Sequence, residues 1–260
     1  MIANANKEKE KYENLDTKVT VRQKHLEKWW LLWRRREELI EKLKTINRYI
    51  ACGQVTKRPI FEFISSSIRP NAELIVFPMN DDYSFGILQS SFHWEWFKEQ
   101  CSTLKSDFRY TSDSVFDTFP WPQWGTFNQT EDFALSNSQT SEKIHCALNI
   151  ASAGRDLRKI RIQIMKENNS SLREIYRMLE LPGNNPLKDA QVSLDNAVRK
   201  AYQLDLPKDM QKADILEILL ELNKICSIKE EQGQPIIPPG LPEFCSNDAR
   251  FISEDCVHLK

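Results

Sequence analysis

A segment near the middle of the chain reads Arg109-Tyr110-Thr111-Ser112-Asp113-Ser114-Val115-Phe116-Asp117-Thr118-Phe119-Pro120-Trp121-Pro122. Each proline lacks a backbone N–H and biases the residue before it towards extended backbone, so residues 119–122 fit neither a helix nor a central strand. We predict a rigid extended segment that lays aromatic rings against the rest of the protein. This clasp serves either packing or recognition, and buried aromatic rings favour packing. Its residues are Tyr110, Phe119, Pro120, Trp121 and Pro122.

The composition is that of a globular protein without a nucleotide-binding loop. The chain has 260 residues and a net charge of −1, and 28% of its residues are charged and 40% hydrophobic. Only 7 glycines are present, and no Gly-rich phosphate-binding motif occurs. Because there is neither a signal peptide nor a run of about 18 apolar residues, we expect a cytoplasmic protein with no membrane span.

The six cysteines and four histidines are scattered along the chain. Their spacings suit neither a zinc site nor a disulfide scaffold, so we expect reduced, packed thiols and no metal. His93 beside Trp94 predicts a packed histidine. Lys98 and Lys105 are near Cys101 in sequence and could lower the pKa of its thiol.

The order of patterns along the chain predicts an α+β protein. Residues 1–20 are expected to be a disordered lead-in. Apolar residues at helical spacing predict a helix over 21–50, and alternation predicts short strands at 60–64 and 74–77. Residues 84–88 fit a strand or a helix, and 90–97 predict a helix opened by a serine cap. Thus 21–125 form a strand-rich domain with a leading helix.

The remainder of the chain predicts a small helical domain. Polar residues at 126–140 are typical of a linker, and residues 141–228 contain helical patterns at 141–165, 171–181, 187–202 and 212–228. Residues 229–260 contain several prolines and predict an irregular tail.

The leading helix is strongly basic. Residues 22–58 contain eleven Lys or Arg side chains against four Glu, a local charge of +7 that includes Arg34 and Arg35. Such a run is either a solvated helix face or a surface that contacts phosphates. The adjacent tryptophans favour nucleic acid slightly.

No constellation of residues predicts catalysis by this chain. We find no nucleophile elbow and no metal-binding pair of histidines. Asp81-Asp82 is a carboxylate pair in an Asn-rich turn, where solvated turn chemistry is the expected role. We therefore assign no catalytic residue.

Three ordered blocks resemble a known family. Residues 85–93, 108–111 and 116–122 are similar to the target-recognition domain of type IIL (single-chain type IIG) restriction–modification enzymes, and residues 172–177, 194–202 and 215–223 are similar to the C-terminal domain of those enzymes. The resemblance implies an adenine-N6 DNA methyltransferase polypeptide that uses S-adenosylmethionine. This chain lacks the Gly-rich cofactor loop and the Asn/Asp-Pro-Pro-Tyr motif, so we expect a truncated protein or split specificity subunit, with no cofactor in this chain.

The main hypothesis is therefore a reader of double-stranded DNA, which works with a separate methyltransferase subunit or domain. Arg and Lys suit phosphates, and Arg, Lys and Asn can also pair with base edges. For Arg109, a packing or salt-bridge role beside Tyr110 is an equal alternative. A helical protein-interaction or scaffold module and an intact but divergent enzyme are the competing hypotheses. The candidate DNA-binding residues are Arg34, Arg35, Lys57, Arg58, Arg69, Asn71, Lys105 and Arg109.

Overall fold

The computed structural model describes residues 36–104, 107–124, 136–179, 182–183, 185–207, 210–246 and 248–258. The chain divides into two units, residues 1–42 and 43–260. The described part of the second unit combines small antiparallel sheets with helices, which confirms the predicted α+β class. Within the described residues, no helix has the length and apolar character that a membrane span requires.

The helix expected over residues 21–50 ends earlier than predicted. Helix α3 spans Glu37–Lys44, and strand β1 follows at Arg48–Gly53, so the prediction of helix up to residue 50 is wrong. Side chains 48–52 are all buried, and a short apolar run of this kind does not distinguish a buried strand from a helix. Residues 21–35 of the expected helix lie outside the described residues.

Strand β1 is the centre of a three-stranded antiparallel sheet. It pairs on one side with β3 (Glu62–Ser65) and on the other with β4 (Leu74–Phe77), which confirms the two strands predicted there. Ile50 lies opposite Phe63 on one side and Phe77 on the other. All three side chains are buried, so this row belongs to the core.

A second, smaller sheet has the order β2 (Val55–Thr56), β6 (Asp107–Arg109) and β5 (Ser102–Leu104). Gln54 connects the two sheets through its backbone. Its N–H donates to the Glu73 carbonyl at 2.8 Å, and its carbonyl accepts from the Tyr110 N–H at 2.8 Å. The turn at Gln54 is therefore held in place from both sides.

Helix α4 (Asp82–Gln89) and helix α5 (Ser91–Gln100) follow the first sheet, so residues 84–88 are helical. The serine cap predicted for α5 is not formed by Ser90, whose hydroxyl donates to the Ile87 carbonyl. Asp195 takes that role from a distant helix, because its carboxylate accepts from the Ser91 N–H at 2.7 Å and the Ser91 hydroxyl at 2.6 Å.

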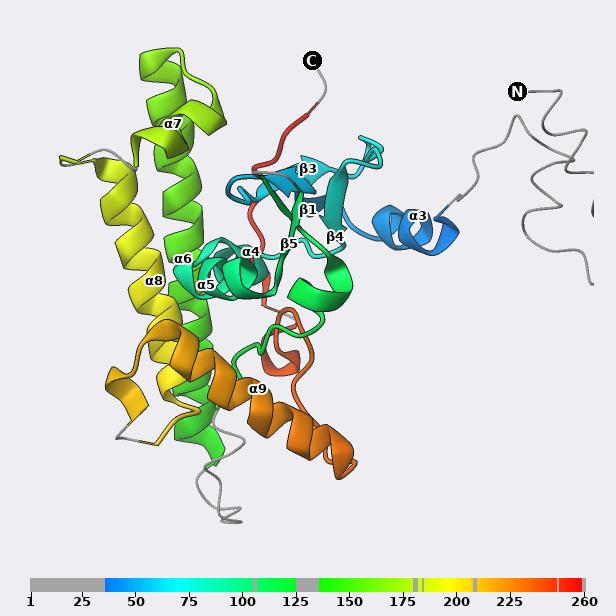
Figure 1. The fold of residues 1–260 in the computed structure, drawn as a ribbon, viewed down its shortest axis with the longest axis vertical. Coiled ribbons are helices and arrows are strands. Elements are labelled where there is room, and N and C mark those ends of the chain that lie inside the picture. Colours follow the sequence, from blue (N-terminus) through cyan, green and yellow to red (C-terminus); the bar gives the residue numbers. More distant parts are fainter. Residues whose placement is uncertain are drawn as a thin grey trace, which may run out of the picture. The chain divides into compact units, whose positions relative to one another are not determined.

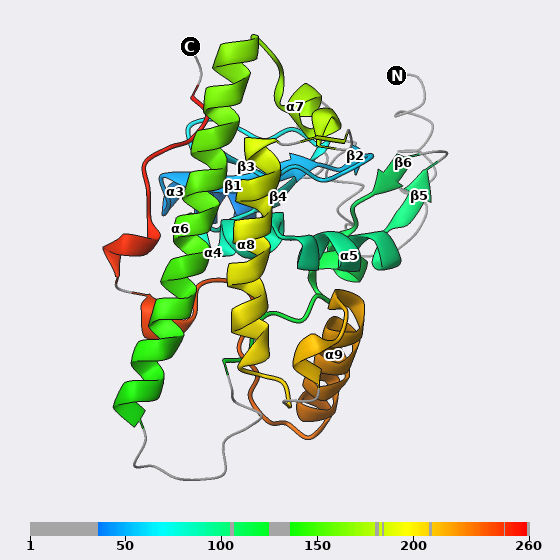
Figure 2. The same ribbon diagram turned by 90° about the vertical axis from the view of Figure 1, so that its left-hand side faces the viewer.

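Helices α6 (Ser136–Asn168) and α8 (Pro186–Gln203) lie side by side, as Figures 1 and 2 show. Helix α4 packs closely against α6 through two glycines. A Cβ on Gly86 would lie 2.6 Å from Cγ2 of Ile150, and a Cβ on Gly154 would lie 3.3 Å from the Asp82 carbonyl. These glycines therefore serve helix packing.

In Figure 2, the other two helices of the C-terminal half, α7 and α9, lie at opposite ends of the layer formed by α6 and α8. Helix α7 (Leu172–Met178) begins with a capping box formed by Ser171 and Glu174. Helix α9 (Ile215–Glu231) packs against α5. A helix is thus present at each of the four segments that were predicted to be helical. Helix α6 begins earlier than predicted, at Ser136, inside the stretch that we expected to be a linker.

The end of the chain packs against the core in spite of its irregular backbone. Two short 3₁₀ turns, at Glu243–Cys245 and Ala249–Phe251, bury Cys245 and Phe251. Val257 then forms a parallel bridge with Ile64 at the edge of the first sheet. Residues 125–135 lie outside the described residues, so the proposed boundary between a recognition domain and a helical domain stays a prediction.

Candidate nucleic-acid interface

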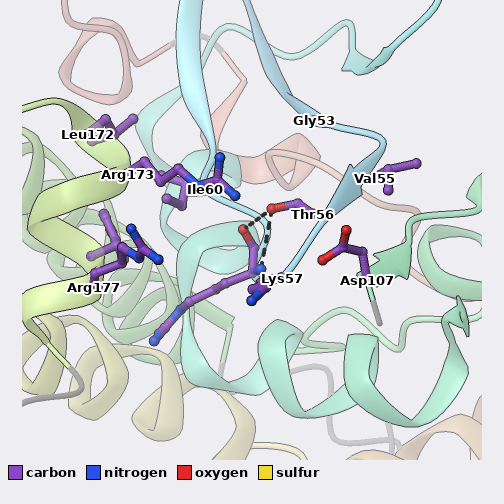
Figure 3. A pocket seen from close by; sticks show the side chains of 11 residues that line it. Gly53, Val55, Thr56, Lys57, Ile60, Asp107, Leu172, Arg173 and Arg177 are labelled. Atoms are coloured by element: carbon purple, nitrogen blue, oxygen red, sulfur yellow. Dashed lines mark hydrogen bonds between the residues drawn. The ribbon is translucent and has the colours of Figure 1, made fainter. Parts of the chain in front are cut away.

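A groove of about 500 Å³ lies between the segment after β1 and helix α7 (Figure 3). Thr56, Lys57 and Arg58 line one wall, and α7 lines the other with Arg173 and Arg177. Four cationic side chains therefore face this groove. The lining residues are Gly53, Val55, Thr56, Lys57, Arg58, Ile60, Asp107, Leu172, Arg173, Tyr176 and Arg177.

A short side-chain motif shapes the first wall. The Thr56 hydroxyl donates to the Arg58 carbonyl at 2.8 Å, and the same oxygen accepts from the Arg58 N–H at 3.3 Å. Threonine commonly closes turns in this way. Lys57 at the tip of the turn is exposed, so its ammonium is available to a ligand.

Arg58 is held more firmly than Lys57. Its guanidinium carbon lies 5.3 Å from the ring centroid of Trp94 and 5.6 Å from that of Tyr176. Such cation–π contacts orient an arginine without neutralising it. Trp94 belongs to α5 and Tyr176 to α7, so this side chain spans elements that are far apart in sequence.

Both walls of the groove are tied to one buried arginine. Arg161 of α6 is 1% exposed, and it donates to the Phe61 carbonyl at 2.9 Å and to the Tyr176 hydroxyl. Its guanidinium also lies 3.8 Å from the Glu62 carboxylate. Because Phe61 and Glu62 closely follow the first wall in the chain and Tyr176 belongs to α7, Arg161 helps to fix the spacing between the two walls.

A second hollow continues from the groove across Gly53 and Val55. It is lined by Gln54, Asn71 and Glu73 as well as these two residues and Leu74. The Asn71 side-chain oxygen accepts from the Glu73 N–H at 3.1 Å. In the part of the chain that the structure describes, the amide NH₂ has no acceptor and is open to a ligand.

Arg109 is exposed on β6, directly opposite Val55. Within the described residues its guanidinium has no hydrogen bond or ion pair. Val55 lines both hollows and pairs with Arg109, so Arg109 belongs to the same region of the surface.

The structure thus brings together four of the eight candidate DNA-binding residues: Lys57, Arg58, Asn71 and Arg109. Arg69 is exposed on the preceding turn, and no hydrogen bond or ion pair among the described residues ties its side chain to this surface. Arg34, Arg35 and Lys105 lie outside the described residues. Arg173 and Arg177 were missed, although their spacing of four residues in a predicted helix places them on one face.

The clasp is buried. Tyr110 is 0%, Phe119 3% and Trp121 2% exposed, and both prolines are buried. The Trp121 ring packs near Tyr83 and Phe116. The rings of Tyr110, Phe119 and Trp121 therefore lie inside the protein, and they do not line the groove.

Polar contacts attach the clasp to the C-terminal helices. Tyr202 of α8 donates to the Pro120 carbonyl at 2.8 Å, and Asn223 of α9 donates to the Thr118 carbonyl at 2.7 Å. Asp205 accepts from the Gln123 N–H at 2.7 Å. These side chains form hydrogen bonds with backbone groups that have no partner in a helix or sheet, because the prolines keep this segment out of regular secondary structure.

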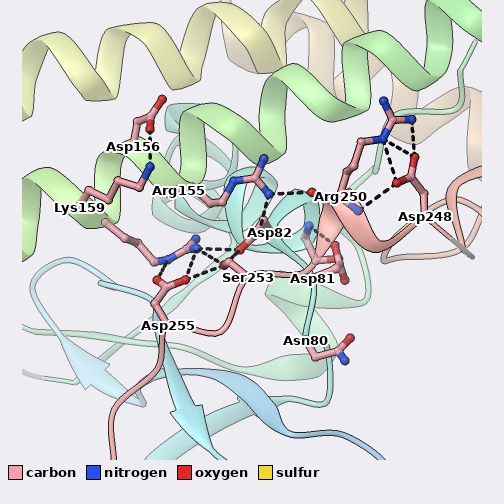
Figure 4. A network of polar contacts seen from close by, with 12 residues as sticks. Asn80, Asp81, Asp82, Arg155, Asp156, Lys159, Asp248, Arg250, Ser253 and Asp255 are labelled. Atoms are coloured by element: carbon pink, nitrogen blue, oxygen red, sulfur yellow. Dashed lines mark hydrogen bonds and ion pairs between the residues drawn. The ribbon is translucent and has the colours of Figure 1, made fainter.

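Asp81 and Asp82 are not solvated, so the expected role in a solvated turn is wrong. Asp82 is completely buried and forms ion pairs with Arg48 at 3.0 Å and Arg158 at 2.6 Å (Figure 4). Arg155 pairs with its other oxygen at 3.0 Å. Asp255 joins the cluster from the tail, 2.6 Å from Arg158. This cluster ties β1, α4, α6 and the tail together.

Burial sets the pKa values of two other groups. The Asp81 carboxylate accepts from the Ser84 N–H at 2.7 Å and caps α4, and burial raises its pKa to about 6. Burial also lowers the pKa of His93 to about 3, so the predicted packed histidine is confirmed. Its Nε2 lies 2.9 Å from the Tyr110 hydroxyl.

Burial raises the pKa of all six cysteine thiols, and the Cys256 sulfur lies 3.3 Å from Nε2 of His258. All six thiols are free, and burial raises the pKa of Cys101, so the lowered pKa that we considered is wrong. Among the described side chains, no cluster of His, Cys, Asp and Glu has the arrangement of a metal site.

Comparisons with known proteins found a matching family model, a related sequence and a similar solved structure. Residues 57–123 match the family model described as the target recognition domain of MmeI. DNA methyltransferase A of Bacillus subtilis (strain 168) is 32% identical over 141 residues, which span 54% of this chain and 13% of that protein. A solved structure of the type IIL restriction–modification enzyme MmeI in complex with DNA matches 87% of this chain and 26% of that chain. Its TM-score is 0.56 at 18% identity, so it shows the shared fold alone.

This chain therefore spans a small part of the length of both relatives. The matched segment contains the Thr56–Arg58 wall from Lys57 onward and the whole clasp. Residues 57–123 are therefore similar to the target recognition domain of MmeI.

Proposed function

We propose that this chain binds double-stranded DNA as the sequence-recognition portion of a site-specific adenine-N6 methyltransferase of a restriction–modification system. One observation carries the proposal: the exposed side chains of Lys57, Asn71 and Arg109, which all belong to the segment that matches the target recognition domain, lie around Val55. Such side chains are the ones that proteins use on phosphates and base edges.

We assign two roles within this surface. Lys57 and Arg58 at the groove would contact phosphates, which contribute affinity without sequence information. Asn71 and Arg109 would reach base edges, because an amide suits adenine and a guanidinium suits guanine in the major groove. Arg69 is kept as a further candidate because of its exposure on the neighbouring turn.

Methyl transfer is assigned to a separate domain or subunit. The packing of Gly86 and Gly154 between helices, and the mainly cationic lining of the groove, support placing the S-adenosylmethionine site in that other domain or subunit. Incubating the purified chain with labelled cofactor and DNA tests this division. A labelled product would support the alternative of an intact but divergent enzyme.

Binding of a fluorescent duplex across a salt series tests the DNA-reader proposal. Affinity should fall steeply between about 50 and 200 mM salt, and Lys57→Ala should reduce the slope of log K against log salt by about 1. Lys224→Ala, at an exposed lysine on α9, is the matched control and should behave as the wild type. Absence of duplex binding at the lowest salt would overturn the proposal and favour the scaffold alternative.

Base reading is tested by selecting preferred duplexes from a randomised pool. Arg109→Ala and Asn71→Ala should change the preferred sequence at one position each, at a cost of about 1–3 kcal/mol on the original site. Lys57→Ala should weaken binding to every duplex equally. Unchanged preference in both base-reader variants would show that other residues read the sequence.

A further inference from the structure

The groove has a second cationic wall that lies outside the matched recognition segment. That segment ends at residue 123, whereas α7 begins at Leu172. We propose that Arg173 and Arg177 form a phosphate-binding wall for the DNA backbone, opposite Lys57 and Arg58. This inference rests on the proposed DNA binding and extends the interface to the C-terminal helices.

The placement of the two arginines supports this assignment. Residues four apart in a helix lie on one face, and both side chains are exposed and line the groove (Figure 3). Within the described residues, neither guanidinium has a hydrogen bond or a salt-bridge partner. Two like charges at this spacing repel each other, and a bound anion would relieve that repulsion.

The groove has little negative charge of its own. Asp107 is the carboxylate among its lining residues, against Lys57, Arg58, Arg173 and Arg177. Glu174 also belongs to α7, but its carboxylate accepts from the Ser171 N–H and hydroxyl at 2.7 Å each. It is therefore engaged in the capping box, and its charge also interacts with that of Arg177. Cations still outnumber carboxylates among the lining residues, and a concave surface lined mainly by charges of one sign concentrates ligands of the opposite sign.

The two walls are also held at a fixed spacing before any ligand arrives. Arg161 bonds to the Phe61 carbonyl behind the first wall and to the Tyr176 hydroxyl behind the second. Arg58 lies between the Trp94 and Tyr176 rings. Preorganised guanidinium groups suit phosphate oxygens, which accept two parallel N–H bonds from one arginine.

The spread of the cations favours a chain of phosphates over one small anion. They come from both sides of a groove of about 500 Å³ and include exposed side chains, whereas a site for one anion gathers its donors around a single point. A nucleic-acid backbone places charges at regular intervals along such a groove.

The test compares the double variant Arg173→Gln/Arg177→Gln with Lys200→Gln/Lys224→Gln, which removes two exposed charges from α8 and α9. Each full-length variant is titrated against the same duplexes across a salt series. The α7 variant should lower the salt slope by about 2 and weaken binding about tenfold on every duplex. The control pair should retain the wild-type slope and affinity.

The outcomes separate this inference from the proposed function. If the wild type binds duplex and the α7 variant has the same slope and affinity, the second wall is refuted and DNA binding stands. If the wild type does not bind duplex, both the second wall and the proposed DNA binding are refuted. Should the double variant melt at a lower temperature than the wild type, the single variants replace it, and each is expected to lower the slope by about 1.

Inorganic phosphate at matched ionic strength distinguishes the source of the anion. If the groove is built for a DNA backbone, the α7 variant should lose affinity for duplex, and calorimetry should detect no saturable binding of inorganic phosphate alone to the wild type. If the wild type binds phosphate and the α7 variant does not, while both bind duplex with the same slope and affinity, the wall is a site for free phosphate, and the backbone assignment is wrong.

Discussion

Neighbouring aspartates at positions 81 and 82 lie in opposite electrostatic surroundings. Asp82 is surrounded by Arg48, Arg155 and Arg158, which stabilise its charge. Asp81 is 5% exposed and has hydrogen bonds to Ser84, but it has no ion pair within the described residues. Burial disfavours a charged carboxylate that has no counter-ion. The same residue type therefore stabilises the fold at one position and makes its stability depend on pH at the next.

The raised pKa of Asp81 predicts the effect of Asp81→Asn. Below about pH 4 the carboxyl is protonated in both states. Between about pH 4 and 6 the unfolded state gives up this proton while the folded state keeps it, so wild-type stability falls as pH rises and levels off above about 6. Asparagine keeps a side-chain cap and carries no charge. The variant should gain up to about 3 kcal/mol relative to wild type between pH 4 and pH 8.

Urea unfolding at several pH values measures this difference. Asp81→Ala is the control, because it also removes the charge but loses the cap, and it should be about 1 kcal/mol less stable than Asp81→Asn at each pH. A constant difference between Asp81→Asn and wild type across this pH range would contradict the raised pKa.

At the scale of elements, the clasp joins the recognition segment to the helices behind it. Its rings fill the core, while its carbonyls accept from Tyr202 and Asn223 on two different helices. The extended backbone follows from the prolines, and that part was predictable from sequence. The partners lie about a hundred residues away in the chain, and no local pattern identifies them.

Trp121→Ala tests the packing role of the clasp. Because the ring is 2% exposed, its removal should leave a cavity and lower the free energy of unfolding by roughly 3–5 kcal/mol. Trp121→Phe should cost less, since it keeps much of the ring. Chemical denaturation measures both. A Trp121→Ala protein that melts as the wild type but loses sequence preference would make the clasp a direct reader of DNA.

Element boundaries were predictable where the pattern was unambiguous. The strand at Leu74–Phe77 coincides with its prediction, because a four-residue apolar run between Asn- and Pro-rich turns is typical of a strand and too short for a helix. The region around residues 48–50 was assigned to a helix because its apolar residues continue the spacing of the preceding segment. Pairing of Ile50 with two neighbouring strands overrode that local signal.

At the scale of the whole molecule, the last residues of the chain complete the buried ion cluster. Ser253 donates to Asp82 at 2.8 Å, and Asp255 accepts from Arg158 at 2.6 Å. Arg158 holds the pKa of Asp255 at about 2 in spite of partial burial. The tail therefore covers two buried arginines, Arg48 and Arg158, that would otherwise lack part of their partners.

Ser253→Ala/Asp255→Ala should destabilise the protein by roughly 1–3 kcal/mol, because buried guanidinium N–H groups lose their acceptors. Hydrogen exchange should accelerate at the Val257 N–H, which donates to the Phe63 carbonyl. Glu254→Ala, at the exposed residue between them, is the control and should change neither stability nor exchange. Unchanged exchange at Val257 in the double variant would show that the cluster does not hold the tail.

The amino-acid sequence was sufficient to predict the class of fold, the extended clasp, most helices and the resemblance to a target-recognition domain. These properties depend on local chemistry, namely proline geometry, apolar periodicity and short motifs. The burial of Asp82 among arginines and the position of α7 opposite Lys57 across a groove became evident from the folded structure. Both depend on contacts between residues far apart in the chain, because burial and electrostatic surroundings arise when distant segments pack together.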